Sequence, residues 1–402
     1  MPLSLNVNSD RNAQNNGRRF NRNANNRPSN AAPMVSELTI RHNGYIMKTY
    51  RNLYHIICSY ENLQLAFQKA RKRKTLKPYV IDFESKLDQH LKQLKYELET
   101  FTYSPASLRT FIFRDPKTRK ISASHFRDRV VHHALCNVIE PILSKDFIYD
   151  SFANQKGKGA HKAVERVESF IRKVVYAGGR GRHLLFEKQS YVGYSLKADV
   201  RHYFDTVDQE ILVRIITKMI KDPKVVWLIR VILQNHKLEI SGKGMPIGNL
   251  TSQFFANVYL NELDHFIKHM IKAKYYVRYV DDFILLHRDK CVLLHWKDLI
   301  NDFLKSELKL ELHPEKTRIV RIADEITMLG YRIFYDHRLL KKSNSRRIWK
   351  RLAKLKALYN EGKISTDQAK LSLDGWIAYA EFADTFALRN RVMLRFDYLF
   401  HA

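Results

Sequence analysis

The spacing of apolar and polar residues changes several times along the chain, and each change predicts a different element. Over residues 53–101 apolar positions recur at helical spacing, with a basic break at 71–74. Residues 109–122 alternate as a β-hairpin does, with Asp115-Pro116-Lys117 as the turn. Helical spacing then returns over about 126–144. The first third of the chain is therefore expected to be helical around one hairpin.

The rest of the chain mixes short strands with helices. Further elements are expected as a Gly/Lys loop at 156–159, a helix over 161–175, a strand within 194–207, a helix from Asp208, a long helix over 248–270, two strands within 275–286, short strands near 308–312 and 328–334, and helices over 345–400. Ser365 and Gln368 form a capping box, which starts a helix near Thr366. The pattern predicts an α+β fold in which helices are segregated from a small antiparallel sheet.

Composition sets the N-terminal residues apart and gives the chain a large positive charge. Residues 1–36 are rich in Asn and Arg and nearly lack large apolar residues, so we expect a disordered tail and place its boundary at residue 40. The 402 residues hold 70 Lys and Arg against 41 Asp and Glu, a net charge of +29, which favours a polyanionic partner. A membrane surface is the rival partner, but it would need one strongly amphipathic basic helix.

The compartment is inferred from cysteines and apolar runs. The three cysteines, Cys58, Cys136 and Cys291, are too few for a disulfide framework. No apolar run is long enough to span a bilayer, and no secretion signal opens the chain. We therefore expect a cytoplasmic protein that is not in a membrane.

Three carboxylates stand at strand ends. Asp281 and Asp282 lie between two apolar stretches, and Asp199 ends a third. An ordinary turn explains the pair equally simply, because Asp favours turns. Adjacent carboxylates between buried strands, however, repel each other and lose hydration, and divalent cations such as a Mg²⁺ pair relieve both costs. Polymerases and nucleases both use such pairs, so the carboxylates alone do not choose between them.

Several motifs occur in the order found in reverse transcriptases. These are Asp199 with Phe204 five positions on, Tyr279-Val280-Asp281-Asp282, Leu312-His313-Pro314-Glu315-Lys316-Thr317 and Met328-Leu329-Gly330-Tyr331. The chain resembles that family from about residue 50 to 335. The resemblance implies a right-hand polymerase fold and RNA-templated DNA synthesis. Fingers are expected over 41–185 with the loop of the 240s, a palm over 186–335 and a short helical thumb over 336–402.

The resemblance also implies residue roles. Asp199, Asp281 and Asp282, helped by the Val200 carbonyl, match the ligands of two Mg²⁺ ions, with Mn²⁺ as the alternative. Lys316 matches a lysine that protonates pyrophosphate, and Phe204 matches the aromatic that crowds a ribose 2′-hydroxyl. Lys117 and Arg119 match the hairpin residues that hold the triphosphate. Plain core packing is the alternative for Phe204, and solvated surface charge for the three basic residues. Nucleic-acid contacts are expected from Lys156, Lys158, Arg346, Arg347, Trp349 and Lys350.

The segment from Gly244 to Gln253 narrows the family. Ile247 stands where many reverse transcriptases have Gln, and Gln253 where they have Pro. This form resembles the reverse transcriptases of diversity-generating retroelements, which copy a template-repeat RNA, misincorporate opposite adenines and work with a small basic accessory protein. Ile247, Gly248 and Gln253 would then contact the incoming dNTP. A Gln can check nucleotide geometry by hydrogen bonding and an Ile cannot; packing is the alternative role for Ile247.

Other assignments stay open. The Asn-rich tail is either an RNA-binding segment or a translated adenine-rich template repeat, in which case Met34 or Met47 would be the natural start. A retron-like or phage-defence reverse transcriptase is the alternative function. A group II intron maturase is less favoured, because no endonuclease or DNA-binding extension follows the expected thumb. The alternative from another functional class is an RNA-binding scaffold with a dormant polymerase site. The intact set of three Asp residues argues against this alternative. The expected ligands are template RNA, its cDNA hybrid and dNTPs, in a bacterial or phage-encoded system.

Overall fold

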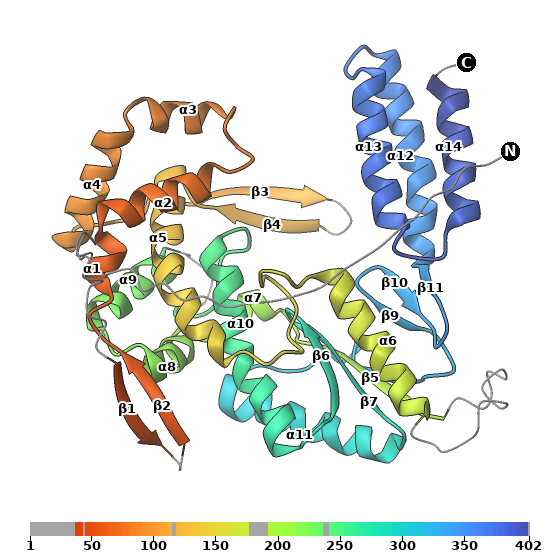
Figure 1. Cartoon of the computed structure of the whole chain (residues 1–402), viewed down its shortest axis with the longest axis horizontal. Helices are drawn as coiled ribbons and strands as arrows, with labels where there is room; N and C mark the ends of the chain where they lie inside the picture. Colours follow the sequence, from red (N-terminus) through yellow and green to blue (C-terminus); the bar gives the residue numbers. More distant parts are fainter. Residues whose placement is uncertain (1–36, 43–44, 115–117, 177–191, 236–240, 401–402) are drawn as a thin grey trace, which may run out of the picture. The chain divides into compact units, whose positions relative to one another are not determined.

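The described structure begins at residue 37, with a strand. The computed structural model describes residues 37–42, 45–114, 118–176, 192–235 and 241–400. Its first elements are the antiparallel strands β1 (Glu37–His42) and β2 (Tyr45–Tyr50) (Figure 1). Residues 37–40, which the expected tail included, pair with β2. The remainder of the expected tail, residues 1–36, lies outside the described residues.

Helices follow β2 as the periodicity predicts. They are α1 (Tyr54–Cys58), α2 (Tyr60–Arg71), α3 (Pro78–Ser85), α4 (Leu87–Glu99), α5 (Phe126–Leu143) and the 3₁₀ turn η1 (Ser144–Asp146). The basic break separates α2 from α3. Pro78 begins α3, where its missing N–H leaves no helical bond unmade. Val130 and Ala134 of α5 are buried, as expected from its apolar face.

The predicted hairpin consists of β3 (Arg109–Arg114) and β4 (Thr118–Ala123). Every residue of β3 is exposed, including Phe111, Ile112 and Phe113. Its turn, with Lys117, lies outside the described residues. The hairpin itself is confirmed.

A four-stranded antiparallel sheet carries the predicted strand ends. It has the order β6-β7-β5-β8, formed by β5 (Tyr194–Asp199), β6 (Tyr275–Tyr279), β7 (Asp282–His287) and β8 (Arg318–Arg321). Helices α6 (Ala160–Tyr176) and α11 (Lys290–Leu308) contact these strands. Between β5 and β6 the chain forms α7 (Tyr203–Thr206), α8 (Gln209–Met219), α9 (Pro223–Gln234), α10 (Leu250–His265) and the π-helical turn η4 (Phe266–Met270). The α+β class is confirmed.

The strand expected at 308–312 is wrong. Leu308 still belongs to α11, and Lys309 adopts a left-handed conformation with φ of 49° that ends the helix. Leu312 makes one isolated bridge, to Val200. The strand that does complete the sheet is β8, whose four residues are too short to give a periodic signal.

The region near 328–334 forms a small sheet of its own, ordered β11-β10-β9. It contains β9 (Ile326–Met328), β10 (Tyr331–Ile333) and β11 (Arg338–Leu340). Leu329 and Gly330, both at positive φ, turn the chain between β9 and β10. The single strand expected there is therefore a hairpin.

Three helices end the chain: α12 (Lys342–Asn360), α13 (Thr366–Ala380) and α14 (Phe386–Phe400). The predicted capping box is confirmed: the Ser365 hydroxyl accepts a bond from the Gln368 N–H, and the Ser365 N–H donates to the Gln368 side chain. Trp376 and Phe396 belong to a buried cluster that also includes Val277 and Ile284 of the four-stranded sheet. Across the described residues, no helix combines the length and apolarity that crossing a membrane requires.

Candidate active site

The sheet brings the three predicted carboxylates together. Asp199 ends β5 and Asp282 begins β7, and the two face each other in register. Asp281 lies in the tight turn between β6 and β7, where Tyr279 pairs with Asp282. The Val200 N–H donates to the Asp281 carbonyl at 3.2 Å, which ties this turn to the end of β5.

Burial and neighbouring negative charge raise the pKa of two of the carboxylates, Asp281 and Asp282. Burial raises the pKa of Asp281, and the nearby charge of Asp199 adds to the effect. Burial raises the pKa of Asp282 to about 6, with further contributions from Asp281 and Asp199. One oxygen of Asp282, Oδ1, is buried and has no hydrogen-bond partner among the described residues. The cluster therefore has more negative charge than the protein around it compensates.

Two lysines partly compensate that charge. Lys316 Nζ donates to Asp199 Oδ1 at 2.8 Å, so the predicted lysine does contact a predicted carboxylate. Lys197, which the sequence reasoning missed, lies 3.6 Å from Asp282 Oδ2 and donates to the Thr327 carbonyl. The sequence does single Lys197 out, because it is the one basic residue in the strand that ends at Asp199.

The donor set fits divalent cations by its chemistry. In the part of the chain that the structure describes, no three His, Cys, Asp or Glu side chains are already arranged as a metal-binding group. The buried, unpartnered Oδ1 of Asp282 and the raised pKa values of the pair are what a carboxylate site shows without its cation. Asp199, Asp281 and Asp282 would hold the ions, which when bound supply charge neutralisation at reacting phosphates. The Val200 carbonyl stays a predicted ligand.

The turn that carries Asp281 is strained. Val280 has φ of 58°, a left-handed conformation that a β-branched residue rarely adopts. Arg278 Nη1 donates to the Val280 carbonyl at 2.9 Å. The Arg278 side chain is fully buried, whereas Val280 is half-buried.

A buried carboxylate holds Arg278 in turn. Asp264, on α10, accepts Arg278 Nε at 2.7 Å and Nη2 at 2.5 Å, and it accepts the Tyr276 hydroxyl at 2.6 Å. A bidentate pair of this kind fixes the guanidinium plane. The sequence analysis assigned Arg278 no function.

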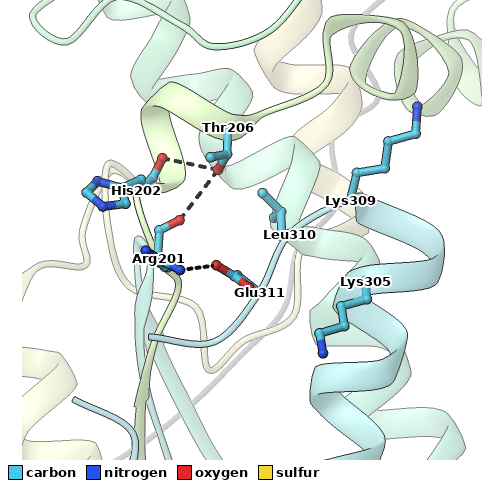
Figure 2. A pocket seen from close by; sticks show the side chains of 7 residues that line it. All are labelled: Arg201, His202, Thr206, Lys305, Lys309, Leu310 and Glu311. Carbon is cyan, nitrogen blue, oxygen red and sulfur yellow. Dashed lines mark hydrogen bonds and ion pairs between the residues drawn. The ribbon is translucent and has the colours of Figure 1, made fainter. Parts of the chain in front are cut away.

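The end of β5 is also tied to the segment that follows α11. Arg201 donates through its side chain to Glu311 Oε1 at 2.7 Å and through its backbone to the Glu311 carbonyl at 2.9 Å (Figure 2). The His313 N–H donates to the Asp199 carbonyl at 2.7 Å. Arg201 and Glu311 border a pocket of about 390 Å³. The bond from His313 to Asp199 brings the segment that contains Lys316 beside Asp199.

The loop of the 240s is bound to the hairpin strand β4. The Ile247 carbonyl accepts the Ser122 N–H at 2.9 Å, and Asn249 Oδ1 accepts the Ser124 N–H at 3.0 Å. Gly248 has φ of 115°, and a Cβ there would come within 2.8 Å of Ile121, so a side chain would be strained and crowded. The loop of the 240s and the hairpin are therefore hydrogen-bonded to each other.

The predicted nucleotide residues differ in exposure. Arg119, on β4, is exposed, and its charge acts against the raised pKa of Asp281, which places it near the carboxylates. Phe204 and Ile247 are half-buried, whereas Gly248 and Gln253 are exposed. The Phe204 carbonyl accepts the Met245 N–H at 2.7 Å. Contacts of these residues with a nucleotide stay predictions, and Lys117 lies outside the described residues.

The predicted nucleic-acid residues fall into two groups. Lys158 Nζ donates to the carbonyls of Tyr149 and Ser151 at 2.8 Å each, so a phosphate contact would have to break bonds within its own loop. The remaining members are all exposed: Lys156 in the Gly/Lys loop, and Arg346, Arg347, Trp349 and Lys350 on α12.

Comparisons with known proteins point to one family. A family model described as "Reverse transcriptase (RNA-dependent DNA polymerase)" matches residues 114–333. Protein YkfC of Escherichia coli is 23% identical over 289 residues, covering 62% of this chain and 72% of its own length. The group II intron-encoded protein LtrA of Lactococcus lactis is 23% identical over 316 residues, covering 61% of this chain and 50% of its own length.

Among solved structures, telomerase from Candida albicans with a fragment of telomeric RNA aligns at 10% identity, with a TM-score of 0.46, over 66% of this chain and 55% of that chain. This chain thus spans about half the length of the intron protein and of the telomerase chain.

The family match covers more than half of the chain and contains the whole carboxylate cluster. It begins at the end of β3 and ends at the end of β10. Asp199, Asp281, Asp282 and the adjoining Lys316 all lie inside it. The chain therefore belongs to the reverse transcriptase family of RNA-dependent DNA polymerases.

Proposed function

We propose that this chain copies a template-repeat RNA into DNA with errors concentrated at template adenines, as the reverse transcriptases of diversity-generating retroelements do. The observation that carries the proposal is Ile247. It lies half-buried on a loop that is hydrogen-bonded to the hairpin strand β4 and that begins next to the backbone of Phe204. An apolar side chain at this point removes a polar check on nucleotide geometry.

The other residues would act around this loop. Asp199, Asp281 and Asp282 would hold two Mg²⁺ ions, and Lys316, 2.8 Å from Asp199, is placed to give a proton to departing pyrophosphate. Phe204 would exclude ribonucleotides, and Arg119 would contact the triphosphate. Residues 41–185, 186–335 and 336–402 would act as fingers, palm and thumb. A small basic accessory protein would complete the complex.

A second function fits the comparisons equally. The similarity to a group II intron-encoded protein suits a retron-like or intron-type reverse transcriptase with a dedicated RNA. The flanking DNA separates the two, because the mutagenic system requires a near-repeat pair that differs at adenines of one copy. Fidelity separates them at the level of the protein.

The test of the mutagenic function is Ile247→Gln, with Ile247→Leu as the matched apolar control. Each enzyme copies one defined RNA, and the cDNA is sequenced. The wild type and Ile247→Leu should err mainly at template adenines, and Ile247→Gln should lower those errors by roughly ten- to two-hundred-fold. Equal error rates at all four template bases in the wild type would reject the mutagenic assignment and leave reverse transcription standing.

A further inference from the structure

A basic pocket of about 580 Å³ lies at the start of strand β6, away from the carboxylates. Its cations are Arg166 and Lys173 of α6, Lys268 of η4, and Lys274, which directly precedes β6. Its rings include Tyr176 and Tyr275. No role proposed above uses these residues.

The described residues do not balance the positive charge of the pocket. Asp150 is the acid in its lining, and it accepts Arg166 Nε at 2.7 Å and lies 3.0 Å from Lys268 Nζ. For Lys173 and Lys274 the described residues provide no acidic partner. The Lys173 ammonium lies over the Phe170 ring, and the Lys274 ammonium lies over the Tyr275 ring. Two ammonium groups are thus left for an anionic ligand.

Exposed tyrosines border these cations. Tyr176, the last residue of α6, is 70% exposed, and so is Tyr149, over whose ring the Arg166 guanidinium lies at 5.1 Å. Exposed rings interleaved with cations are the arrangement that binds single-stranded nucleic acid, because unpaired bases stack on the rings while phosphates meet the cations. A paired duplex cannot present its bases to the rings in this way.

The position of the pocket shows which part of an RNA could reach it. Strand β6 begins at Tyr275 and ends at Tyr279, and Asp281 lies two residues beyond that end. At about 3.3 Å per residue, the strand alone separates the two ends by roughly 13 Å. The nucleotide being copied lies at the carboxylates, so a strand in this pocket must be another part of the molecule.

We propose that this pocket binds an unpaired segment of the RNA outside the part being copied, with phosphates on Lys173 and Lys274 and a base on Tyr176. The proposal rests on the proposed function in that the ligand is the template RNA. An acidic protein segment is the competing occupant; it would use the lysines but would have no need of a planar ring.

The test is the affinity of the whole chain for an unstructured single-stranded RNA of about 12 nucleotides, measured by fluorescence anisotropy without dNTPs or divalent ions. Lys173→Ser with Lys274→Ser should weaken binding about tenfold and flatten the log K against log salt slope by about 1.4, at about 0.7 per lost phosphate contact. The matched control, Lys290→Ser with Lys305→Ser on α11, removes the same charge and should change affinity less than twofold.

A second pair of variants tests the ring. Tyr176→Phe should bind as the wild type does, and Tyr176→Ser should bind about tenfold more weakly, because stacking needs the ring and not the hydroxyl. Three results would each overturn the proposal: an equal loss of RNA affinity in the two lysine double variants, no loss of affinity in Tyr176→Ser, or displacement of the RNA by polyglutamate as effective as by RNA itself. The assay measures binding and not synthesis, so its outcome does not depend on whether the chain makes cDNA.

Discussion

At the residue scale, the buried Arg278 guanidinium connects α10 to the turn that carries Asp281. It contacts the Val280 carbonyl directly and is fixed by Asp264 from α10. Breaking a buried ion pair typically costs about 3–5 kcal/mol, because the remaining charge is left without its partner. Arg278 therefore holds this turn together with the bond from the Val200 N–H to the Asp281 carbonyl.

We expect Arg278→Lys to fold but to hold this turn poorly, because an ammonium cannot reproduce the bidentate fork. The Mg²⁺ concentration for half-maximal synthesis should rise about tenfold, the effect of roughly 1.4 kcal/mol. It is measured by Mg²⁺ titration of dNTP incorporation on an RNA template.

Arg338→Lys is the matched control. Arg338 Nη1 contacts both oxygens of Glu168, at 3.0 and 3.1 Å, in a pair that joins α6 to β11. Its replacement should lower the melting temperature without changing the Mg²⁺ requirement. Equal Mg²⁺ requirements in both variants and the wild type would make Arg278 a core residue with no influence on the site.

The sequence predicted the three Asp residues because each stands where an apolar strand ends. It could not predict the use of Arg278, since its partner Asp264 comes from a helix that precedes β6 and nothing in the linear pattern links the two. The same holds for the 2.8 Å contact between Lys316 and Asp199. The resemblance assigned Lys316 to the site, but only the folded structure shows that it contacts Asp199.

At the element scale, an ion pair joins the end of α10 to the turn η1. His265 Nε2 lies 3.1 Å from Asp146 Oδ2 and 3.0 Å from the Asp146 carbonyl. Hydrogen bonding to Asp146 raises the pKa of His265 to about 9. Because the folded pKa is above the ordinary value of about 6.5, this pair contributes stability that is complete below pH 6.5 and is lost as pH rises through about 9.

The expected result is a pH-dependent difference between the wild type and His265→Gln. The melting temperature of the wild type should exceed that of the variant at pH 6, and the two should converge by about pH 9.5. The difference should be small, since both side chains are more than one third exposed. A difference that stays constant over this pH range would mean that His265 acts by packing alone.

Helices were predicted better than short strands. The capping box at Ser365 and the basic break after α2 are local signals, so the sequence contains them directly. The four residues of β8 are a strand because β5 pairs with them, and that partner is more than a hundred residues away. The segment 308–312 shows the reverse case, because its apolar pattern predicted a strand that does not form. Helix α11 ends there at the left-handed Lys309, and Leu312 makes a single bridge to Val200.

At the scale of the whole molecule, the right-hand polymerase fold expected from the motifs is consistent with the family match and with the observed small antiparallel sheet and its helices. The buried cluster that runs from the sheet to α14 shows that the C-terminal helices share a core with the strands that carry the site. The net charge of +29 suits a template–primer polyanion.

We propose that Asp281 and Asp282, with Asp199, carry out metal-dependent DNA synthesis on RNA. The direct test is Mg²⁺-dependent dNTP incorporation on an RNA template by Asp281→Asn with Asp282→Asn. Synthesis should fall to background, while RNA affinity stays within about twofold and the melting temperature is not lowered, because the substitution removes repelling buried charges. Synthesis at the wild-type rate by this folded double variant would contradict the account.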